Sequence, residues 1–246
     1  MKIAVVGATG TLGSAVVARA EQGHEVARIA RSLGVDVLTG EGLTEALSGC
    51  EVVIDCGKPP TLEEGEATDW YEQAARTLGE AATAAGIART VAVSIVGIDR
   101  TQDFPFYRTQ LAHEAAVRRW CPGPVIVRST QFHDFVGVML TEDEDGLSIL
   151  DAPSQPVDTV VVAEVVLDAA TAAEPPAMSQ IAGPREERTL DQARRLLAAR
   201  GDRREVRGVP ASPSMMARGM LPDADVPRRG PTYDEWLATH EENRHR

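Results

Sequence analysis

The chain has 246 residues, of which 43% are hydrophobic, and its formal net charge is -12 at pH 7. This length suits one large α/β domain or a domain with a small appendage. The acidic balance argues against nucleic-acid binding, which needs a basic patch, and against a basic helix on a membrane surface. We therefore expect a small-molecule substrate, no nucleic acid and no membrane as partners. The oligomeric state stays open.

The cysteines and the N-terminal residues indicate the compartment. Cys50, Cys56 and Cys121 are too few and too scattered for a disulfide framework or a zinc cluster. MKIAVVG leads directly into a strand without the features of a signal peptide. No window approaches the ~20 apolar residues of a membrane span. We expect a cytoplasmic protein with reduced thiols and no metal.

The first 130 residues alternate short apolar runs with longer amphipathic ones. Continuous runs such as VVI and VAV fit strands that are buried on both faces. The predicted strands are 3–7, 24–31, 35–40, 51–56, 89–97 and 124–130, and the predicted helices are 11–23, 43–49, 67–86 and 108–120. This alternation predicts an α/β fold with a doubly wound parallel sheet.

The remaining residues are less regular. Asp158 and Thr189 are predicted to cap helices at 158–173 and 190–201, with a strand at 178–184 and a last helix at 233–242. The proline-rich segment 210–231 is predicted to be loosely packed. We expect residues 1–150 to form a nucleotide-binding core. Residues 151–246 then supply the remaining sheet and helix elements and a small substrate-side subdomain, and they are not independent of the core.

A glycine-rich loop, GATGTLG at residues 7–13, lies between the first predicted strand and the first helix. In this context Gly7 permits a tight turn, Gly10 lets the backbone approach a pyrophosphate, and Gly13 lets the helix pack on the strand. The phosphates are expected at the helix N-terminus, where free N–H groups and the helix dipole favour anions. The core is thus predicted to be Rossmann-type, with cofactor contacts from Gly7, Thr9, Gly10, Thr11, Leu12 and Gly13.

The end of the second strand bears on the choice between NAD(H) and NADP(H). NAD binders usually place an acid there for the ribose 2′-hydroxyl, but this strand ends in Ala30-Arg31-Ser32. An arginine suits a 2′-phosphate through charge-assisted hydrogen bonds. Arg31 and Ser32 are therefore predicted cofactor contacts, and NADP(H) is favoured over NAD(H). The alternative is a solvated surface arginine.

The end of the fourth strand reads Asp55-Cys56-Gly57-Lys58. Ligands of a doubly wound sheet bind beyond the carboxyl ends of its strands. Gly57 would permit close approach to the cofactor ribose, and Lys58 would reach a phosphate. Cys56, Gly57 and Lys58 are predicted cofactor contacts, with a solvated Lys58 as the alternative.

The G-x-x-G-x-x-G spacing resembles the short-chain dehydrogenase/reductase superfamily in its atypical or extended branch. More of the chain resembles the NmrA-like NAD(P)-binding group, which includes reductases, epimerase-like enzymes and redox sensors without turnover. The resembling segments are VVGATGTLGSAVVARAEQGHEVARIAR (5–31), TVAVSIVGIDR (90–100), PFYRTQLAHEAAVRRW (105–120), VIVRSTQFHDF (125–135) and GPTYDEWLA (230–238).

This resemblance implies a Ser that binds a substrate carbonyl, a Tyr that transfers a proton and a Lys that holds the nicotinamide ribose. Ser94 fits the first role. If Tyr107 is the Tyr, Leu111 replaces the Lys; in the alignment that we prefer, Phe106 replaces the Tyr and Gln110 replaces the Lys. Gln110 can hydrogen-bond a ribose, but it carries no charge that would lower a phenol pKa.

Further candidates lie on and after the helix at 108–120. His133 is a possible acid or base, with a pocket-lining or capping histidine as the alternative. His113 and Glu114 are predicted to lie on a solvated face, and the acidic stretch 141–146 to be a solvated loop and not a metal site.

The sequence predicts an NAD(P)H-dependent reductase that acts on a small carbonyl, quinone or enone. NADPH is the expected cofactor. Ser94, Tyr107 and His133 are the candidate catalytic residues. Two alternatives remain: an NADP(H)-sensing regulatory protein without turnover, and a non-redox tailoring enzyme on the same scaffold.

Overall fold

The computed structural model describes residues 1–244, with side chains as far as His240. The chain forms two compact units, and each is discontinuous in sequence. Unit 1 contains residues 1–95, 105–128 and 162–179; unit 2 contains residues 96–104, 129–161 and the chain from 180 onward. The predicted division at residue 150 treats each part as continuous and so does not follow this interleaving. The dependence of the C-terminal part on the core stays a prediction.

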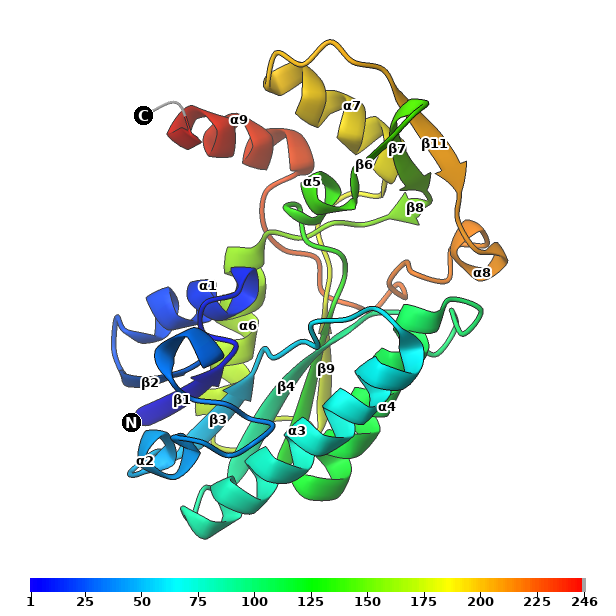
Figure 1. The fold of residues 1–246 in the computed structure, drawn as a ribbon. Helices are drawn as coiled ribbons and strands as arrows, with labels where there is room; N and C mark the ends of the chain where they lie inside the picture. Colours follow the sequence, from blue (N-terminus) through cyan, green and yellow to red (C-terminus); the bar gives the residue numbers. More distant parts are fainter. Residues whose placement is uncertain (245–246) are drawn as a thin grey trace. The chain divides into compact units, whose positions relative to one another are not determined.

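The central sheet has six strands in the order β2-β1-β3-β4-β5-β9 (Figure 1). The strands are β1 (Lys2–Val6), β2 (Glu25–Ile29), β3 (Val52–Asp55), β4 (Arg89–Ile95), β5 (Pro124–Ser129) and β9 (Met178–Ile181). β1, β3, β4 and β5 contain runs of buried, mostly branched apolar residues, which suit strands covered on both faces. The predicted doubly wound parallel sheet is confirmed.

The position of β1 fixes where a ligand can bind. β2 pairs in parallel with one side of β1 and β3 with the other, so the chain reverses direction across the sheet at this strand. Val6 at the end of β1 lies opposite both Ile29 and Asp55. The loops that follow β1, β2 and β3 therefore begin at one edge of the sheet, which is the topological switch point of such folds.

Helices cover both faces of this sheet. α3 (Glu64–Ala84) and α4 (Pro105–Trp120) lie on one face, with α2 (Leu43–Leu47) near the edge, and α1 (Thr11–Ala20) and α6 (Thr159–Thr171) lie on the other (Figure 1). Small side chains let α3 and α4 approach the strands, since Ala75, Ala116 and Val117 pack with Ala92 and Ile126. This close packing makes α4 a rigid support for whatever its buried face carries.

The strand predicted at 35–40 is wrong, because this segment is a turn. The Asp36 side chain accepts a hydrogen bond from the N–H of Leu38 at 2.7 Å, and its carbonyl accepts one from Gly40 at 2.8 Å. Gly40 has a φ of +79°, which closes the turn at little steric cost. Of the residues in this segment, only Val37 is buried.

Unit 2 contains short strands that the sequence did not predict. β7 (Gly146–Asp151) pairs antiparallel with β6 (Thr141–Asp143) and parallel with β11 (Val206–Pro210), while β8 (Pro153–Ser154) pairs with β10 (Glu187–Arg188). The helices are α5 (Phe135–Met139), α7 (Thr189–Ala199), α8 (Pro213–Met216) and α9 (Tyr233–Arg244). Leu147, Ile149, Leu196, Val206 and Tyr233 belong to one buried cluster, which gives unit 2 its own core.

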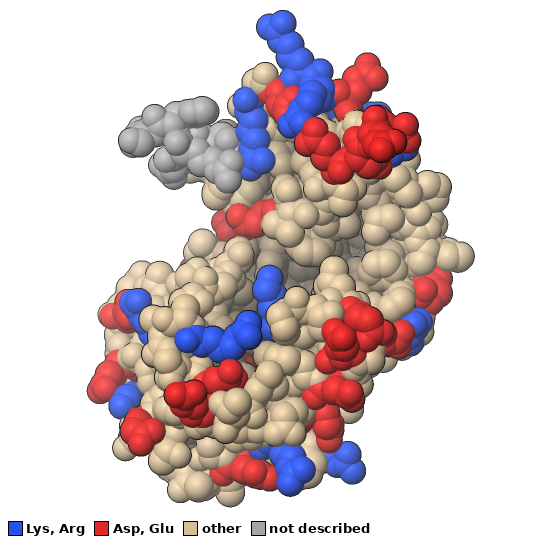
Figure 2. Space-filling view, in the orientation of Figure 1, with Lys and Arg blue, Asp and Glu red and all other residues tan. Residues whose placement is uncertain are grey.

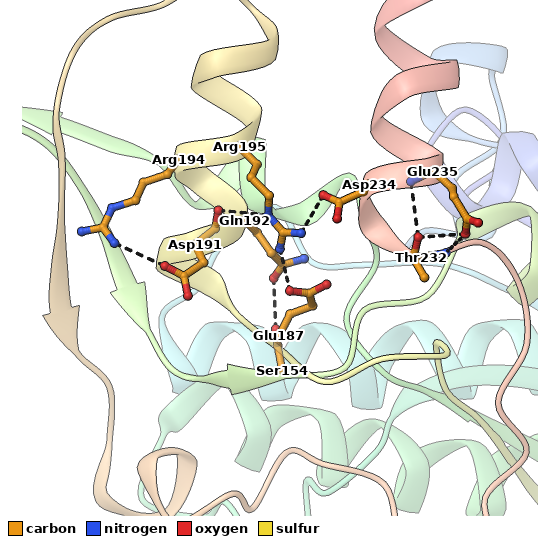
Figure 3. A network of polar contacts seen from close by, with 9 residues as sticks. All are labelled: Ser154, Glu187, Asp191, Gln192, Arg194, Arg195, Thr232, Asp234 and Glu235. Atoms are coloured by element: carbon orange, nitrogen blue, oxygen red, sulfur yellow. Dashed lines mark hydrogen bonds and ion pairs between the residues drawn. The ribbon is translucent and has the colours of Figure 1, made fainter.

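Polar contacts fasten α7 to α9 within this unit (Figure 3). Arg195 bonds Glu187 at 2.6 Å and Asp234 at 2.7 Å, and its guanidinium lies 5.1 Å from the Tyr233 ring centroid. Gln192 is fully buried and accepts a hydrogen bond from Ser154 at 3.0 Å. Because the Arg195 side chain bonds two carboxylates and lies over an aromatic ring, it links α7 to the start of α9.

The predicted cap at Asp158 is confirmed, since its carboxylate accepts a hydrogen bond from the N–H of Val160 at 3.0 Å. The predicted cap at Thr189 is wrong. Its hydroxyl instead accepts from the N–H of Ala152 and donates to the carbonyl of Leu150, so tertiary partners replace the local one. The segment 210–231 is also more closely packed than predicted, with Met215 and Met220 buried.

Within the described residues, no helix has both the length and the apolar character needed to cross a bilayer. On the face drawn in Figure 2, acidic and basic side chains are interspersed and neither sign forms a continuous field. Many of the arginines are engaged in ion pairs, for example Arg188 with Asp151 at 2.6 Å and Arg218 with Glu186 at 2.6 Å.

Candidate functional site

The loop between β1 and α1 is shaped by Gly7 and Gly13. Gly7 has a φ of +71°, and a Cβ placed on it would lie 2.6 Å from the carbonyl oxygen of Cys56. A Cβ on Gly13 would lie 2.1 Å from the carbonyl oxygen of Gly7. Backbone therefore packs on backbone at both positions, and only glycine leaves that room.

The N-terminus of α1 offers backbone donors to an anion. The extended residue Gly10 precedes the helix and donates its N–H to the carbonyl of Gly7 at 2.9 Å. The N–H groups of the first helical turn have no carbonyl partner within the helix, and the helix dipole favours negative charge beside them. A pyrophosphate fits this cradle. The cofactor contacts assigned to Thr9, Gly10, Thr11 and Leu12 stay predictions.

The end of β2 presents a cation. Arg31 begins the single 3₁₀ turn Arg31–Leu33, and both Arg31 and Ser32 are exposed. Arg28, which lies three residues earlier within β2, pairs with Glu21 at 2.6 Å. Arg31 has no ion-pair partner in the part of the chain that the structure describes. Its guanidinium is thus available to an anionic group at the switch-point edge.

The loop after β3 adds a second cation at the same edge. Lys58 is exposed, whereas Lys2 lies at the start of β1 and donates to the carbonyl of Ser48 at 2.9 Å. Burial and the neighbouring charge of Asp55 raise the pKa of the Cys56 thiol, so this group stays protonated at neutral pH. The loop therefore offers an ammonium group and backbone atoms, but no thiolate, to a ligand.

Gln110 lies in the interior, 6% exposed, on the face of α4 that meets α3. Its amide nitrogen donates a hydrogen bond to the hydroxyl of Tyr71 at 2.8 Å. The amide oxygen and the second N–H of the amide nitrogen would remain for a ribose hydroxyl. The predicted ribose contact stays a prediction, and Gln110 supplies no positive charge in the place where the resemblance expects a lysine.

Tyr107 is also buried, with 7% of its surface exposed, and its ring meets that of Phe106 at 5.5 Å between centroids. Burial raises the pKa of the Tyr107 phenol above its usual value. A raised pKa makes the phenolate scarce at neutral pH and also makes the phenol a weaker acid. Burial therefore makes this tyrosine a poorer proton donor than an exposed phenol.

Ser94 lies near a buried ion pair. Arg128, at 9% side-chain exposure, donates from Nε and Nη2 to the carboxylate of Glu114 at 2.7 and 3.0 Å. Ser94 is 2% exposed and lies close enough to this carboxylate to help lower its pKa. The predicted role of Ser94 at a substrate carbonyl stays a prediction.

The prediction that His113 and Glu114 lie on a solvated face is wrong, since they are 2% and 1% exposed. Each contacts a buried polar side chain on a neighbouring strand. Glu114 pairs with Arg128, and His113 bonds the carboxylate of Asp55 at 3.2 Å. A useful signal was their spacing, because Gln110, His113 and Glu114 repeat at helical intervals before the buried Val117.

His133 belongs to unit 2 and is 1% exposed. Its Nε2 donates to the carbonyl oxygen of Pro231 at 3.2 Å, and its ring packs 5.3 Å from that of Trp236. Burial lowers the pKa of His133, so the neutral ring prevails at pH 7. These are the contacts of a histidine packed in the interior of unit 2, and both the catalytic role and its alternatives stay predictions.

The acidic stretch 141–146 forms the β6–β7 hairpin. Glu142, Asp143 and Asp145 lie 3.1, 2.6 and 3.5 Å from Arg204 or Arg207. Among the described residues, no group of three or more His, Cys, Asp or Glu side chains is arranged to hold a metal ion.

Comparison with known proteins agrees with this geometry. Residues 7–120 match the family model described as NAD(P)H-binding. A short-chain dehydrogenase/reductase superfamily protein of Agrobacterium tumefaciens with bound NAD has 18% identity and a TM-score of 0.71, over 100% of this chain and 97% of that chain. No curated protein matches the sequence.

Two sugar-nucleotide epimerases of Bacillus cereus share the same fold. The UDP-N-acetylglucosamine 4-epimerase has 15% identity and a TM-score of 0.72, with 100% of both chains covered. The UDP-glucuronic acid 4-epimerase, in complex with UDP-glucuronic acid and NAD, has 15% identity and a TM-score of 0.72, with 98% of both chains covered. At such identities the likeness concerns the fold alone.

The central parallel sheet and the switch-point loops form a Rossmann-like α/β fold, which the compared structures share. Within this fold, residues 7–120 match the NAD(P)H-binding family model.

Proposed function

We propose that the protein is an NADP(H)-dependent reductase that acts on a small quinone, enone or other carbonyl compound. The observation that carries the cofactor choice is Arg31, exposed at the end of β2, without an ion-pair partner among the described residues. No acid stands at residues 30–33 to favour a free ribose 2′-hydroxyl. A guanidinium in that position suits a 2′-phosphate.

The substrate class follows from the proton donors. When bound, NADPH would supply a hydride to the acceptor. Tyr107, with its raised pKa, and Ser94, beside the Glu114 carboxylate, are weak proton sources. Hydride addition to a quinone or an enone gives a delocalised oxyanion that takes its proton from water. A simple ketone would give an alkoxide, which needs a stronger donor, so conjugated acceptors suit this chain better.

Arg31→Ala tests the cofactor choice. We expect the Kd for NADPH to rise about ten- to a hundred-fold, because a charge-assisted contact with the 2′-phosphate is lost, and the Kd for NADH to change less than about two-fold. The matched control is Arg28→Ala, since Arg28 is paired with Glu21. Equal losses for the two cofactors, or equal effects of the two variants, would contradict the proposal.

Tyr107→Phe tests the substrate class. Because burial keeps the phenol from acting as a ready acid, we expect kcat for quinone or enone reduction to stay within about three-fold of wild type. The measurement is steady-state NADPH oxidation with a panel of quinones, enones and simple ketones. A loss of about a hundred-fold or more, the usual size of acid catalysis, would assign the proton to Tyr107 after all.

A second candidate function is an NADP(H) sensor without turnover. It is favoured by the internal engagement of Gln110 with Tyr71. A sensor would bind NADPH tightly and oxidise it with no member of the acceptor panel. Turnover with any quinone or enone at a rate of about one per second or more would decide for the enzyme.

A further inference from the structure

The carboxylate of Asp55 is a buried charge at the last residue of β3, with 9% of its side chain exposed. Its Oδ1 accepts a hydrogen bond from the N–H of Gly57 at 2.8 Å, which closes a local turn. Its Oδ2 accepts one from Nε2 of His113 at 3.2 Å. Burial opposes the charge, but the bonds from His113 and Gly57 hold the pKa of Asp55 below its usual range.

His113 is fixed on its other sides as well. Its ring stacks on Tyr71, with 4.3 Å between centroids and 22° between planes. A carboxylate only accepts hydrogen bonds, so Nε2 carries the proton. Nδ1 is buried without a protein partner among the described residues, and the ring borders a cavity of about 10 Å³ that Asp55 and Trp70 also line. Such a space holds about one water molecule.

The turn held by Asp55 lies directly against the glycine loop. A Cβ on Gly7 would meet the carbonyl oxygen of Cys56 at 2.6 Å and the backbone nitrogen of Gly57 at 3.2 Å. The N–H of Cys56 donates to the carbonyl of Val6 at 3.1 Å. The path of residues 55–57 therefore sets how closely the loop after β3 packs against the glycine loop at the switch point.

We propose that Asp55 and His113 are positioning residues for the cofactor. His113 on α4 donates a hydrogen bond to the Asp55 carboxylate, and the same carboxylate accepts one from the backbone N–H of Gly57. Helix α4 thereby fixes the position of the loop 56–58. In this arrangement α4 acts on the cofactor through His113, while Gln110, one turn earlier, is engaged by Tyr71. The proposal rests on the proposed binding of NADP(H) at this edge.

The first test does not need the cofactor. Amide hydrogen exchange of a peptide covering residues 56–62 is measured in the cofactor-free protein. His113→Phe keeps an aromatic ring on Tyr71 but loses the bond to Asp55, and Asp55→Ala removes both bonds. We expect both variants to exchange about ten-fold faster in this peptide. Asp55→Asn retains an acceptor for Gly57 and is expected to stay within about three-fold of wild type.

The second test measures NADPH affinity in the same variants. His113→Phe and Asp55→Ala are expected to raise the Kd about ten-fold, and Asp55→Asn less than about three-fold. The control is Tyr71→Phe, which keeps the stacking ring and alters only the bond to Gln110, and its Kd should stay within about two-fold of wild type. Thermal melting of each variant checks that it is folded.

Unchanged exchange in both His113→Phe and Asp55→Ala would overturn the proposal, and so would equally faster exchange throughout α3 and α4, because the pair would then be ordinary packing. Exchange in Asp55→Asn as fast as in Asp55→Ala would overturn it too. If the wild-type protein binds neither NADPH nor NADH, the proposed function falls. Localised faster exchange would then still establish that the pair fixes the loop.

Discussion

Replacing Gly13 with alanine is expected to lower the free energy of unfolding by about 3 kcal/mol or more and to abolish detectable cofactor binding. The added Cβ would lie 2.1 Å from the carbonyl oxygen and 2.7 Å from the carbonyl carbon of Gly7. Both are backbone atoms of the loop, so no side chain can move aside. Urea denaturation measures the stability, and fluorescence titration measures the binding.

Two other glycines serve as controls for Gly13→Ala. A Cβ on Gly10 would meet only the carbonyl oxygen of Gly7, at 3.3 Å, and one on Gly23 would meet nothing within 4 Å. Gly10→Ala is expected to cost less than about 1 kcal/mol of stability yet to weaken NADPH binding, because a methyl group stands where the pyrophosphate approaches. Gly23→Ala should leave binding unchanged. A Gly13→Ala variant as stable as Gly23→Ala would contradict the packing described here.

Breaking the buried pair of Glu114 and Arg128 is expected to have the largest effect outside the loops. Arg128→Met should destabilise the protein by about 3–5 kcal/mol, because it leaves the Glu114 carboxylate, 1% exposed, without its main partner. The partly exposed Arg118, which bonds Glu114 at 3.0 Å, compensates in part. In a double-mutant cycle, adding Glu114→Gln to Arg128→Met should recover part of the loss. Additive losses would mean that the two groups do not interact.

The same pair gives a pH dependence. Burial alone would raise the pKa of Glu114, but the hydrogen bonds from Arg128 and the charge of Arg128 hold it below its usual value. A carboxyl with a depressed folded-state pKa contributes stability above its unfolded pKa, about 4.3, and loses it as pH falls through the folded value. The stability difference between wild type and Glu114→Gln should therefore be full at pH 7 and narrow in acid below about pH 4. A difference independent of pH would contradict this assignment.

Most of the fold was predictable because burial on both faces leaves a plain record in the sequence. VVI, VAV and the other apolar runs became strands of the central sheet. The strand predicted at 35–40 was wrong because Asp36 and Gly40 close a turn. Their hydrogen bond and the positive φ of Gly40 outweigh the strand preference of two valines. Strand β11 was missed because Arg207 and Val209 are exposed, and its pairing with β7 joins residues far apart in the chain.

The site was predictable only where backbone geometry demands a residue type. Gly7 and Gly13 stand where a Cβ would clash, so their spacing in the sequence carries the information. His113 and Glu114 were misjudged because, although their helical spacing with Gln110 and Val117 indicates a buried face, a buried polar side chain also needs a partner, and the partners Asp55 and Arg128 lie on strands of the sheet. The interior position of Gln110 likewise depends on Tyr71, a residue of another helix.

The central claim is that the switch-point loops hold NADP(H), and a fluorescence titration of the wild-type protein tests it most directly. Trp70 is a natural reporter, since its ring comes within 3.5 Å of a Cβ placed on Gly57. We expect saturable quenching by both cofactors, with NADPH bound at least about five-fold more tightly than NADH. Tighter binding of NADH would overturn the role given to Arg31. Absence of binding by either cofactor would contradict the account as a whole.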